Sequence, residues 1–350
     1  MKGKRYLPVG ILICIILIIQ LLTSLFHAEY YLTQLTMSAY YTLAAVGLCM
    51  LMGYTGQISM GQAGFFALGG YVSAVLTTRN FSAMKEEGII LFLEKLSFLK
   101  TDTNMYGEDI LFLNPWLAFA AAILLTAAIA FIIGIPVLKL KGHYLAMATL
   151  GFCIIIYRIV LGTRFLGEAD GISSVPSFSL VPGLSVSGDF STRIQNYYIA
   201  WSIVIIGLVL LINLINSRTG RALRYIHGNE EAAGAMGVNT SRYKLIVFII
   251  SAVFASLGGI FLTHYNGGIG PSEAGIMKSV RYVAIVALGG MANLWGTLIM
   301  GTLLNFLSLR GVFGSFDDAV FGGILIVIMI FAPEGIIKPG HKRRQPGAPS

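Results

Sequence analysis

Charged residues are scarce in this sequence. Asp, Glu, Lys and Arg make up 11% of its 350 residues, whereas apolar residues make up 56% and the mean hydropathy is +0.79. A soluble chain of this length could not keep so much apolar side chain away from water. The composition therefore excludes an ordinary soluble protein and predicts a membrane protein.

Reactive and metal-binding patterns are also missing. The three cysteines, Cys14, Cys49 and Cys153, lie inside apolar runs, and no two have the spacing of a metal or redox site. The five histidines are scattered without an H-E-x-x-H pattern, and there is no G-x-x-x-x-G-K-[ST] phosphate loop. The sequence G-Q-I-S-M-G around Ser59 differs from the G-x-S-x-G elbow of hydrolases. We therefore expect no metal, no cofactor and no enzymatic activity on this chain.

Apolar runs of about 20 residues recur along the chain, which is the length that an α-helix needs to cross a bilayer. They lack the alternation of barrel strands. The predicted fold class is an all-α polytopic helical membrane protein with about 8–10 transmembrane helices. We expect one transmembrane domain over residues 1–350, with its membrane core at 8–335. The ten candidate crossings are 8–28, 33–52, 59–78, 115–137, 143–163, 197–216, 244–264, 280–292, 296–310 and 319–332.

The distribution of charge predicts the orientation. Ten crossings place both termini on one side, which carries 14 basic and three acidic residues, whereas the other side carries nine basic and 13 acidic residues. The positive-inside rule then makes the termini, the 217–244 segment and a basic tail at 336–350 cytoplasmic. A single crossing over 280–310 would send that tail outside, so we expect a break near Asn293–Gly296. The net charge of +8 reflects this orientation, and no basic-aromatic patch points to nucleic acid.

Two long outer loops follow from this topology. Residues 79–114 contain a short apolar stretch, Ile89 to Leu99, that can lie on the membrane or cap the outer mouth. Residues 164–196 are rich in Gly, Ser and Pro. Each loop either receives a solute or partner, or is a solvated connector. For Arg158, near the outer end of its crossing, we favour snorkelling or helix pairing over a pathway role.

The segment Gly53 to Tyr71 reads GYTGQISMGQAGFFALGGY, in which turn-forming and polar residues precede a helix. Small residues recur at helical spacing and predict one stripe that lets helices approach closely in lipid. They are Ser59, Ala63, Ala67, Gly70 and Ala74.

Polar side chains of this segment need partners at membrane depth, from protein or from a water-filled cavity. One interpretation is tight packing with hydrogen bonds across the helix interface. The other is an interrupted segment that lines the solute path. A second glycine-rich stretch, Val286 to Leu304, only hints at duplication. The candidate gate or pathway residues are Gln57, Ser59, Gln62, Gly289 and Gly290.

The 217–244 segment is a polar island with five Lys or Arg residues between two apolar runs. It predicts a short helix of small residues from Asn229 to Val238, with an N-cap, acids in its first turn, and Gly237 or Asn239 at its end. Such a helix can enter a groove in a partner, although an ordinary surface loop is the alternative. The candidate docking residues are Asn229, Glu230, Glu231, Ala232, Ala233, Gly234 and Gly237.

Several motifs together resemble one family. EEAAGAMGVNTSRYK followed by LIVFIISAVFASLGGIF resembles the cytoplasmic coupling loop of permeases of ATP-binding-cassette (ABC) importers, specifically the branched-chain amino-acid permeases. The segment at 53–71 is similar to that family's N-terminal glycine-rich signature, and VALGGMANLWG to its late glycine motif. Leu140 to Pro176 is similar to the segment that distinguishes the LivM-type subunit. The family usually has a glycine where Ala292-Asn293 stands, and the 79–114 loop is longer than usual.

The resemblance implies an ABC-importer permease fold and a multi-pass protein of a bacterial plasma (inner) membrane. It implies inward transport of Leu, Ile, Val or a similar small solute by a complex with two cytoplasmic ATPases that bind the ATP. The other implied partners are a second, homologous permease and an extracytoplasmic solute-binding protein. The alternatives are a permease for urea, short amides or simple sugars, and a stand-alone secondary transporter or channel. The latter predicts coupling carboxylates deep inside crossings, and none is found.

Overall fold

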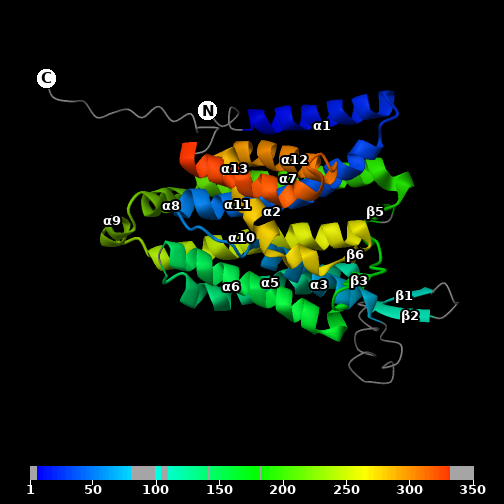
Figure 1. The fold of residues 1–350 in the computed structure, drawn as a ribbon, viewed down its shortest axis with the longest axis horizontal. Helices are drawn as coiled ribbons and strands as arrows, with labels where there is room; N and C mark the ends of the chain where they lie inside the picture. The colour runs from blue at the N-terminus through cyan, green and yellow to red at the C-terminus, as the bar shows by residue number, and fades with distance from the viewer. Residues whose placement is uncertain (1–5, 80–98, 104–108, 141, 182, 332–350) are drawn as a thin grey trace.

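The computed structural model describes residues 6–79, 99–103, 109–140, 142–181 and 183–331 (Figure 1). Within these residues ten helices form a bundle: α1 (Leu7–Leu25), α2 (Tyr30–Thr55), α3 (Gln62–Thr78), α5 (Pro115–Val137), α6 (His143–Gly162), α7 (Arg193–Asn216), α10 (Thr240–Asn266), α11 (Ile276–Gly289), α12 (Leu294–Leu309) and α13 (Asp317–Phe331). Two more, α8 (Arg218–Gly228) and α9 (Glu230–Ala235), lie between α7 and α10. The predicted all-α class is confirmed.

Each predicted crossing corresponds to one of the ten bundle helices, with bounds that differ by four residues or fewer. Six of these helices are long and apolar enough to cross a membrane. The other four, α3, α11, α12 and α13, contain 17, 14, 16 and 15 residues. At about 1.5 Å per residue they reach roughly 21–26 Å, which is less than a hydrocarbon core of about 30 Å. These four helices therefore cover only part of the membrane depth by themselves.

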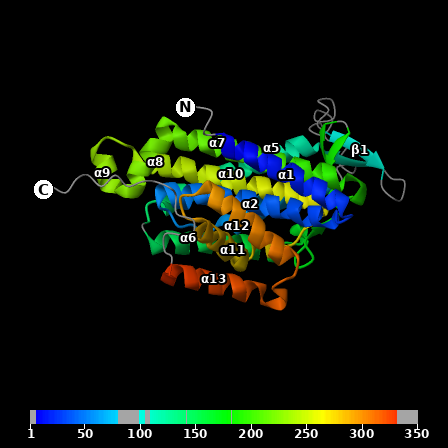
Figure 2. The same ribbon diagram turned by 90° about the horizontal axis from the view of Figure 1, so that it is seen from above.

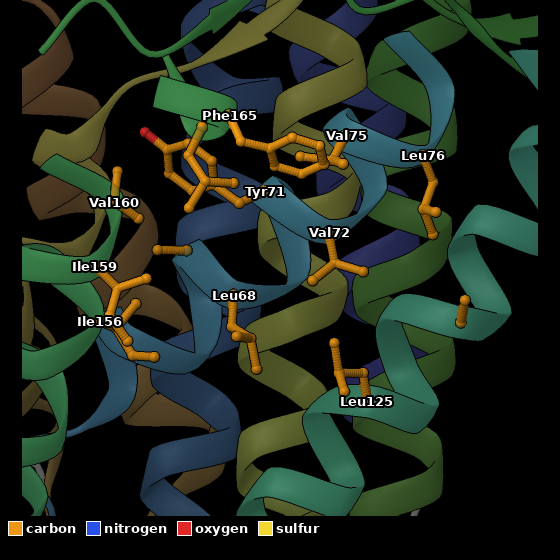
Figure 3. Close-up of a pocket in the computed structure, with 13 residues that line it drawn as sticks. Leu68, Tyr71, Val72, Val75, Leu76, Leu125, Ile156, Ile159, Val160 and Phe165 are labelled. Carbon is orange, nitrogen blue, oxygen red and sulfur yellow. The ribbon is translucent and has the colours of Figure 1, made fainter. Parts of the chain in front are cut away.

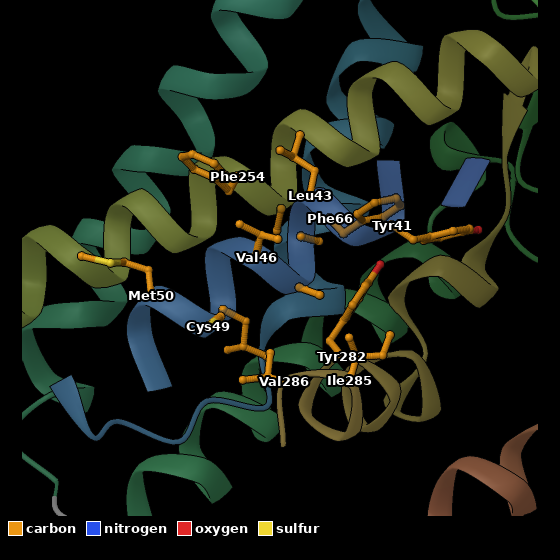
Figure 4. Packing of buried hydrophobic residues seen from close by; sticks show 14 of the residues in the cluster. Tyr41, Leu43, Val46, Cys49, Met50, Phe66, Phe254, Tyr282, Ile285 and Val286 are labelled. Atoms are coloured by element: carbon orange, nitrogen blue, oxygen red, sulfur yellow. The ribbon is translucent and has the colours of Figure 1, made fainter. Parts of the chain in front are cut away.

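Helices α2 and α10 lie at the centre of the bundle in both views (Figures 1 and 2). Every residue of α2 from Ser38 to Gly53 is buried. A helix that is buried all round must be surrounded by protein. Figure 4 shows its side chains between Phe254 of α10 on one side and Tyr282 and Val286 of α11 on the other. By contrast, α1 leaves a row of Ile and Leu side chains exposed, as a lipid-facing helix would.

Small residues bring the backbones of α3 and α10 together. A Cβ added to Gly69 would lie 2.3 Å from the Ser256 Oγ, and one added to Gly259 would lie 2.0 Å from the Phe66 carbonyl oxygen. The predicted stripe of small residues is confirmed for its helical members, Ala63, Ala67, Gly70 and Ala74, which are all buried. Its first member is wrong, because Ser59 precedes α3 in the irregular segment 56–61.

The predicted break in the late apolar region is confirmed. Helix α11 ends at Gly289, and Gly290 follows with φ of +90°, a conformation that favours glycine. The Asn293 side chain then caps α12 by accepting a hydrogen bond from the Gly296 N–H at 3.2 Å. A Cβ on Gly296 would lie 1.9 Å from the Gly289 carbonyl oxygen. The backbones at the end of α11 and at the start of α12 are therefore in close contact.

Short strands lie in the regions that the sequence predicted to be outer loops. Antiparallel pairs join β1 (Leu99–Thr103) to β2 (Asp109–Leu113), β3 (Ile172–Ser173) to β6 (Gly268–Ile269), and β4 (Phe178–Val181) to β5 (Leu184–Val186). The regions 79–114 and 164–196 therefore contain the antiparallel pairs β1–β2 and β4–β5, which the sequence analysis missed. The apolar stretch at 89–98 and the basic tail at 336–350 lie outside the described residues.

The two ends of the bundle differ. Helices α8 and α9 project from one end, and the strands gather at the other (Figure 1). Helix α1 begins, and α13 ends, toward the α8–α9 end, as an even number of crossings requires. Which end faces the cytoplasm stays a prediction from charge.

Candidate functional site

The predicted short helix of the polar island is α9, and both of its ends are closed by hydrogen bonds. The Asn229 side chain accepts from the Ala232 N–H at 3.0 Å, as an N-cap does. At the other end the Gly237 N–H donates to Gly234 and the Val238 N–H donates to Ala233, with Gly237 at φ +83°. This is a Schellman C-cap, so Gly237 ends the helix. Asn239 instead caps α10 by accepting from the Arg242 N–H.

One side of α9 is anchored and the other is open. Ala233 is buried, and the Glu230 carboxylate pairs with the buried Lys244 at the start of α10, at 2.5 Å. The remaining side chains of the turn face outward, and Met236 is 78% exposed. A Cβ on Gly234 would meet no atom within 4 Å. The chain therefore presents a capped helix whose exposed residues are mostly small at this end of the bundle.

A second helix of the island, α8, was missed by the sequence analysis, which predicted only the helix from Asn229 to Val238 within 217–244. Its N-terminus is capped by Ser217, whose side chain accepts from the Gly220 N–H. Its buried face carries Leu223 and Ile226, while most of its basic side chains are exposed. The apolar residues at a spacing of three, behind a Ser cap, were the signal that could have revealed it.

Helix α8 touches the irregular segment that follows α2. Gly56 ends α2 with φ of +68°, and a Cβ there would lie 3.1 Å from the His227 Nδ1 at the end of α8. Nearby, the Tyr54 hydroxyl donates to the Ala292 carbonyl at 3.1 Å. A Cβ on Gly53 would lie 1.6 Å from the Met291 carbonyl oxygen. The fold thus brings together the polar island, the first glycine-rich segment and the α11–α12 turn.

The three polar pathway candidates are placed differently. The Gln62 amide is fully used, because its Nε2 donates to the Ala44 and Ser251 carbonyls at 3.0 Å and its Oε1 accepts from the Ser251 hydroxyl. This geometry agrees with the interpretation of Gln62 as a packing residue. Ser59 is buried and accepts from the Gly61 N–H. Gln57 is also buried, and its Nε2 has no partner.

The two glycine candidates lie at the backbone contact between α11 and α12. A Cβ on Gly289 would lie 2.4 Å from the Thr297 nitrogen. Gly290 supplies the positive φ of the turn. Both are needed for this close contact, and their role in a gate stays a prediction.

An apolar pocket of about 450 Å³ lies between α3, α5 and α6 (Figure 3). Leu68, Val72, Leu125 and Ile156 are among its lining residues, and no polar atom faces it. In Figure 3 the Tyr71 hydroxyl points away from Val72 and Leu125. A pocket without a polar group has no means to orient a charged or hydroxylated solute. It is suited to an acyl chain or another apolar group.

Two clusters of charged side chains lie near α11. The sequence analysis only counted these residues among the outer charges. In one, Arg281 pairs with Asp317 and Asp318 and donates to the Ser308 hydroxyl, which joins α11, α12 and α13. In the other, Lys278 pairs with Glu273 of the 3₁₀ helix η5 (Pro271–Ala274). Arg158 lies on the exposed face of α6, so it is free to snorkel.

Comparison with known proteins finds one matching protein family. The sequence model of the family described as "Branched-chain amino acid transport system / permease component" matches residues 30–332. The high-affinity branched-chain amino acid transport system permease protein LivM of Salmonella typhimurium (strain LT2) is 29% identical over 86% of this chain and 68% of its own length. Permease protein LivH of the corresponding system of Escherichia coli (strain K12) is 26% identical over 88% and 96%.

A third relative has a different substrate in its name. The ribose import permease protein RbsC of Bacillus subtilis (strain 168) is 30% identical over 43% of this chain and 51% of its own length. No solved structure matches the chain significantly.

Proposed function

We propose the function of this chain from one premise: it belongs to the family of the permease component of branched-chain amino acid transport systems. The chain is the membrane-spanning permease subunit of an ABC importer that carries leucine, isoleucine, valine or a closely similar solute inward. The cargo is taken from the LivM and LivH relatives, which match most of the chain, in preference to the ribose permease, which matches less than half.

The open surface of α9 is the observation that supports coupling of this chain to an ATPase. A six-residue helix that exposes mostly small side chains, is capped at both ends and is pinned to α10 through Glu230 and Lys244 suits a groove in a rigid partner. The sequence contains no phosphate loop of its own. We infer that two cytoplasmic ATPases bind there, one on this chain and one on a second, homologous permease.

The mechanism follows from the contacts of α8 and α9. When the ATPases close on ATP, force on α9 passes to α10 through the Glu230–Lys244 pair and to the α2 end through His227 and Gly56. The α11–α12 turn is in contact with that same α2 end at Gly53. Because these elements are in direct contact, a shift of α9 moves the helix ends together and alternates access to the path. An extracytoplasmic binding protein delivers the solute at the opposite, strand-bearing end.

Uptake by the purified system tests the cargo. The chain is co-expressed with its neighbouring transport components, and the complex is reconstituted with the ATPases inside and the binding protein outside. We expect ATP-dependent accumulation of radiolabelled leucine, isoleucine or valine, and competition among the three. Ribose and urea serve as matched probes. Accumulation of ribose with no competition by leucine would contradict the assignment of cargo.

Site-directed thiol labelling tests the orientation. In a chain with Cys14→Ser, we expect Met236→Cys to react with a membrane-impermeant maleimide only after the membrane is permeabilised, because the positive-inside rule places α9 in the cytoplasm. Met236 is a suitable position because its side chain is exposed and its capping bonds at the end of α9 are made by the backbone N–H, which a cysteine keeps. The matched control is Ser191→Cys at the opposite end, which should react in sealed cells. Reaction of the Met236→Cys variant in sealed cells would contradict the predicted orientation and place α9 on the outer side.

A further inference from the structure

A charged cluster lies near the end of α11 that is opposite to α8 and α9. It is built from Glu273 of η5, Lys278 of α11 and Tyr41 of α2. The Lys278 ammonium lies 3.1 Å from both the Glu273 Oε1 and the Tyr41 hydroxyl, and the Tyr41 hydroxyl donates to the same Oε1 at 2.9 Å. The ammonium also stacks 4.3 Å from the centre of the Tyr41 ring.

The cluster is connected to two more tyrosines. Phe66 stacks against Tyr41 with 5.5 Å between ring centres, and it packs at a tilt against Tyr282 with 6.2 Å between ring centres. In Figure 4 the hydroxyl end of Tyr282 lies next to Tyr41 and Phe66. Tyr71 of α3 packs in one cluster of buried residues with Ala274 of η5. Tyr282 and Tyr71 therefore lie beside the residues that form the cluster.

Three polar atoms of this group are buried without a hydrogen-bond partner among the residues that the structure describes: the Glu273 Oε2, the Tyr71 hydroxyl and the Tyr282 hydroxyl. The two tyrosines are only 3% and 1% exposed. Unpaired buried groups carry the full penalty of leaving water, so several of them around one carboxylate call for an explanation. Lys278 also has three donors, of which two are used.

We propose that this cluster binds the zwitterionic head group of an α-amino acid, an inference that rests on the proposed function. The unpaired Glu273 Oε2 accepts from the α-ammonium group. The Tyr71 and Tyr282 hydroxyls and the third N–H of Lys278 donate to the α-carboxylate. The unused hydrogen-bonding groups are thus one anionic acceptor and several donors, which is the combination that a zwitterion requires. The side chains of Glu273 and Lys278 keep 15% and 23% exposure, so the edge of the cluster reaches the surface of this chain.

The orphan hydroxyls allow a test that separates binding from packing. Removing an unpaired buried hydroxyl relieves a desolvation penalty, so Tyr282→Phe and Tyr71→Phe should leave the thermal stability of the complex equal or raised. If the hydroxyls bind the carboxylate, the same variants lose leucine uptake by about tenfold, as expected for a lost hydrogen bond to a charged group. A packing role would leave uptake unchanged.

Tyr40→Phe is the matched control. Tyr40 is on α2 and fully buried, its hydroxyl also has no partner, and its ring packs on Phe261 and Tyr265 of α10, away from Glu273. The experiment measures leucine uptake and the melting temperature of the reconstituted complex for all three variants. Reduced uptake with retained stability in Tyr71→Phe and Tyr282→Phe, and normal uptake in Tyr40→Phe, supports the site.

Uptake equal to that of Tyr40→Phe, or uptake that falls in parallel with the melting temperature, overturns the site. Glu273→Gln provides a second readout, because it keeps the shape and removes the charge. We expect its KM for leucine to rise about tenfold while ATP hydrolysis stimulated by the binding protein persists. Unchanged KM overturns the proposal. Failure of the unmodified complex to carry any branched-chain amino acid would instead reject the proposed cargo.

Discussion

Replacement of Gly234 by arginine is expected to abolish transport and leave the permease folded in its membrane. A Cβ at this position meets no atom within 4 Å, and the residue lies on the open side of α9. The long side chain therefore extends into the space that we assign to the ATPase groove. A mismatch of this kind at the centre of an interface weakens binding by about 2 kcal/mol or more, which is roughly 30-fold or more in affinity.

The measurement compares leucine uptake, ATP hydrolysis and co-purification of the ATPase for the Gly234→Arg complex. We expect uptake and co-purification to fall together, while the amount of permease in the membrane stays at the level of the unmodified protein. Gly234→Ala is the matched control, since one methyl group fits the open space and alanine favours a helix. Wild-type uptake by Gly234→Arg would show that the ATPase does not dock on this side of α9.

The helices could be predicted from sequence because each depends on its own run of residues. Apolar length located the ten bundle helices, and Asn229 and Gly237 marked the ends of α9 through local capping chemistry. Helix α8 was missed because a row of basic residues hid its two buried apolar positions, Leu223 and Ile226. Hydropathy is a poor guide to a short helix in which polar residues outnumber the buried apolar ones.

The candidate sites were harder to predict because their contacts join distant parts of the chain. The sequence marks Gln62 as a pathway candidate, but it does not reveal that the hydrogen-bond partners of its amide, Ala44 and Ser251, lie on two other helices. In the same way, Glu273 and Lys278 were only two of many outer charges in the sequence. Their pairing with Tyr41, more than 200 residues away, exists only in the folded bundle. Local rules do not determine such pairs, because they depend on which helices become neighbours.

The contact between the α2 end and the α11–α12 turn also depends on distant residues, and it leads to the prediction with the largest effect on folding. At Gly53 an added Cβ would lie 1.6 Å from the Met291 carbonyl oxygen, 2.5 Å from its carbon and 2.6 Å from the Ala292 Cα. All three atoms belong to the backbone, so no side chain can turn aside to make room. In a membrane, close backbone packing supplies much of the energy that holds helices together.

Gly53→Ala is therefore expected to destabilise the permease by about 3 kcal/mol or more, at the upper end of the cost of overpacking. The substituted chain either forces α2 away from the turn or fails to assemble. The Tyr54 bond to the Ala292 carbonyl would then be lost as well. The measurement is the melting temperature of the solubilised protein, followed by size-exclusion chromatography after heating, together with the amount of protein inserted in the membrane.

The control is Gly151→Ala in α6, where an added Cβ meets no atom within 4 Å and φ is not positive. It should melt at or slightly above the temperature of the unmodified protein, because alanine is the better helix former. Equal melting of the two variants would mean that the α2 end and the α11–α12 turn are not in contact. The route proposed for force from α9 to the α11–α12 turn would then fail with it, since that route passes through Gly53.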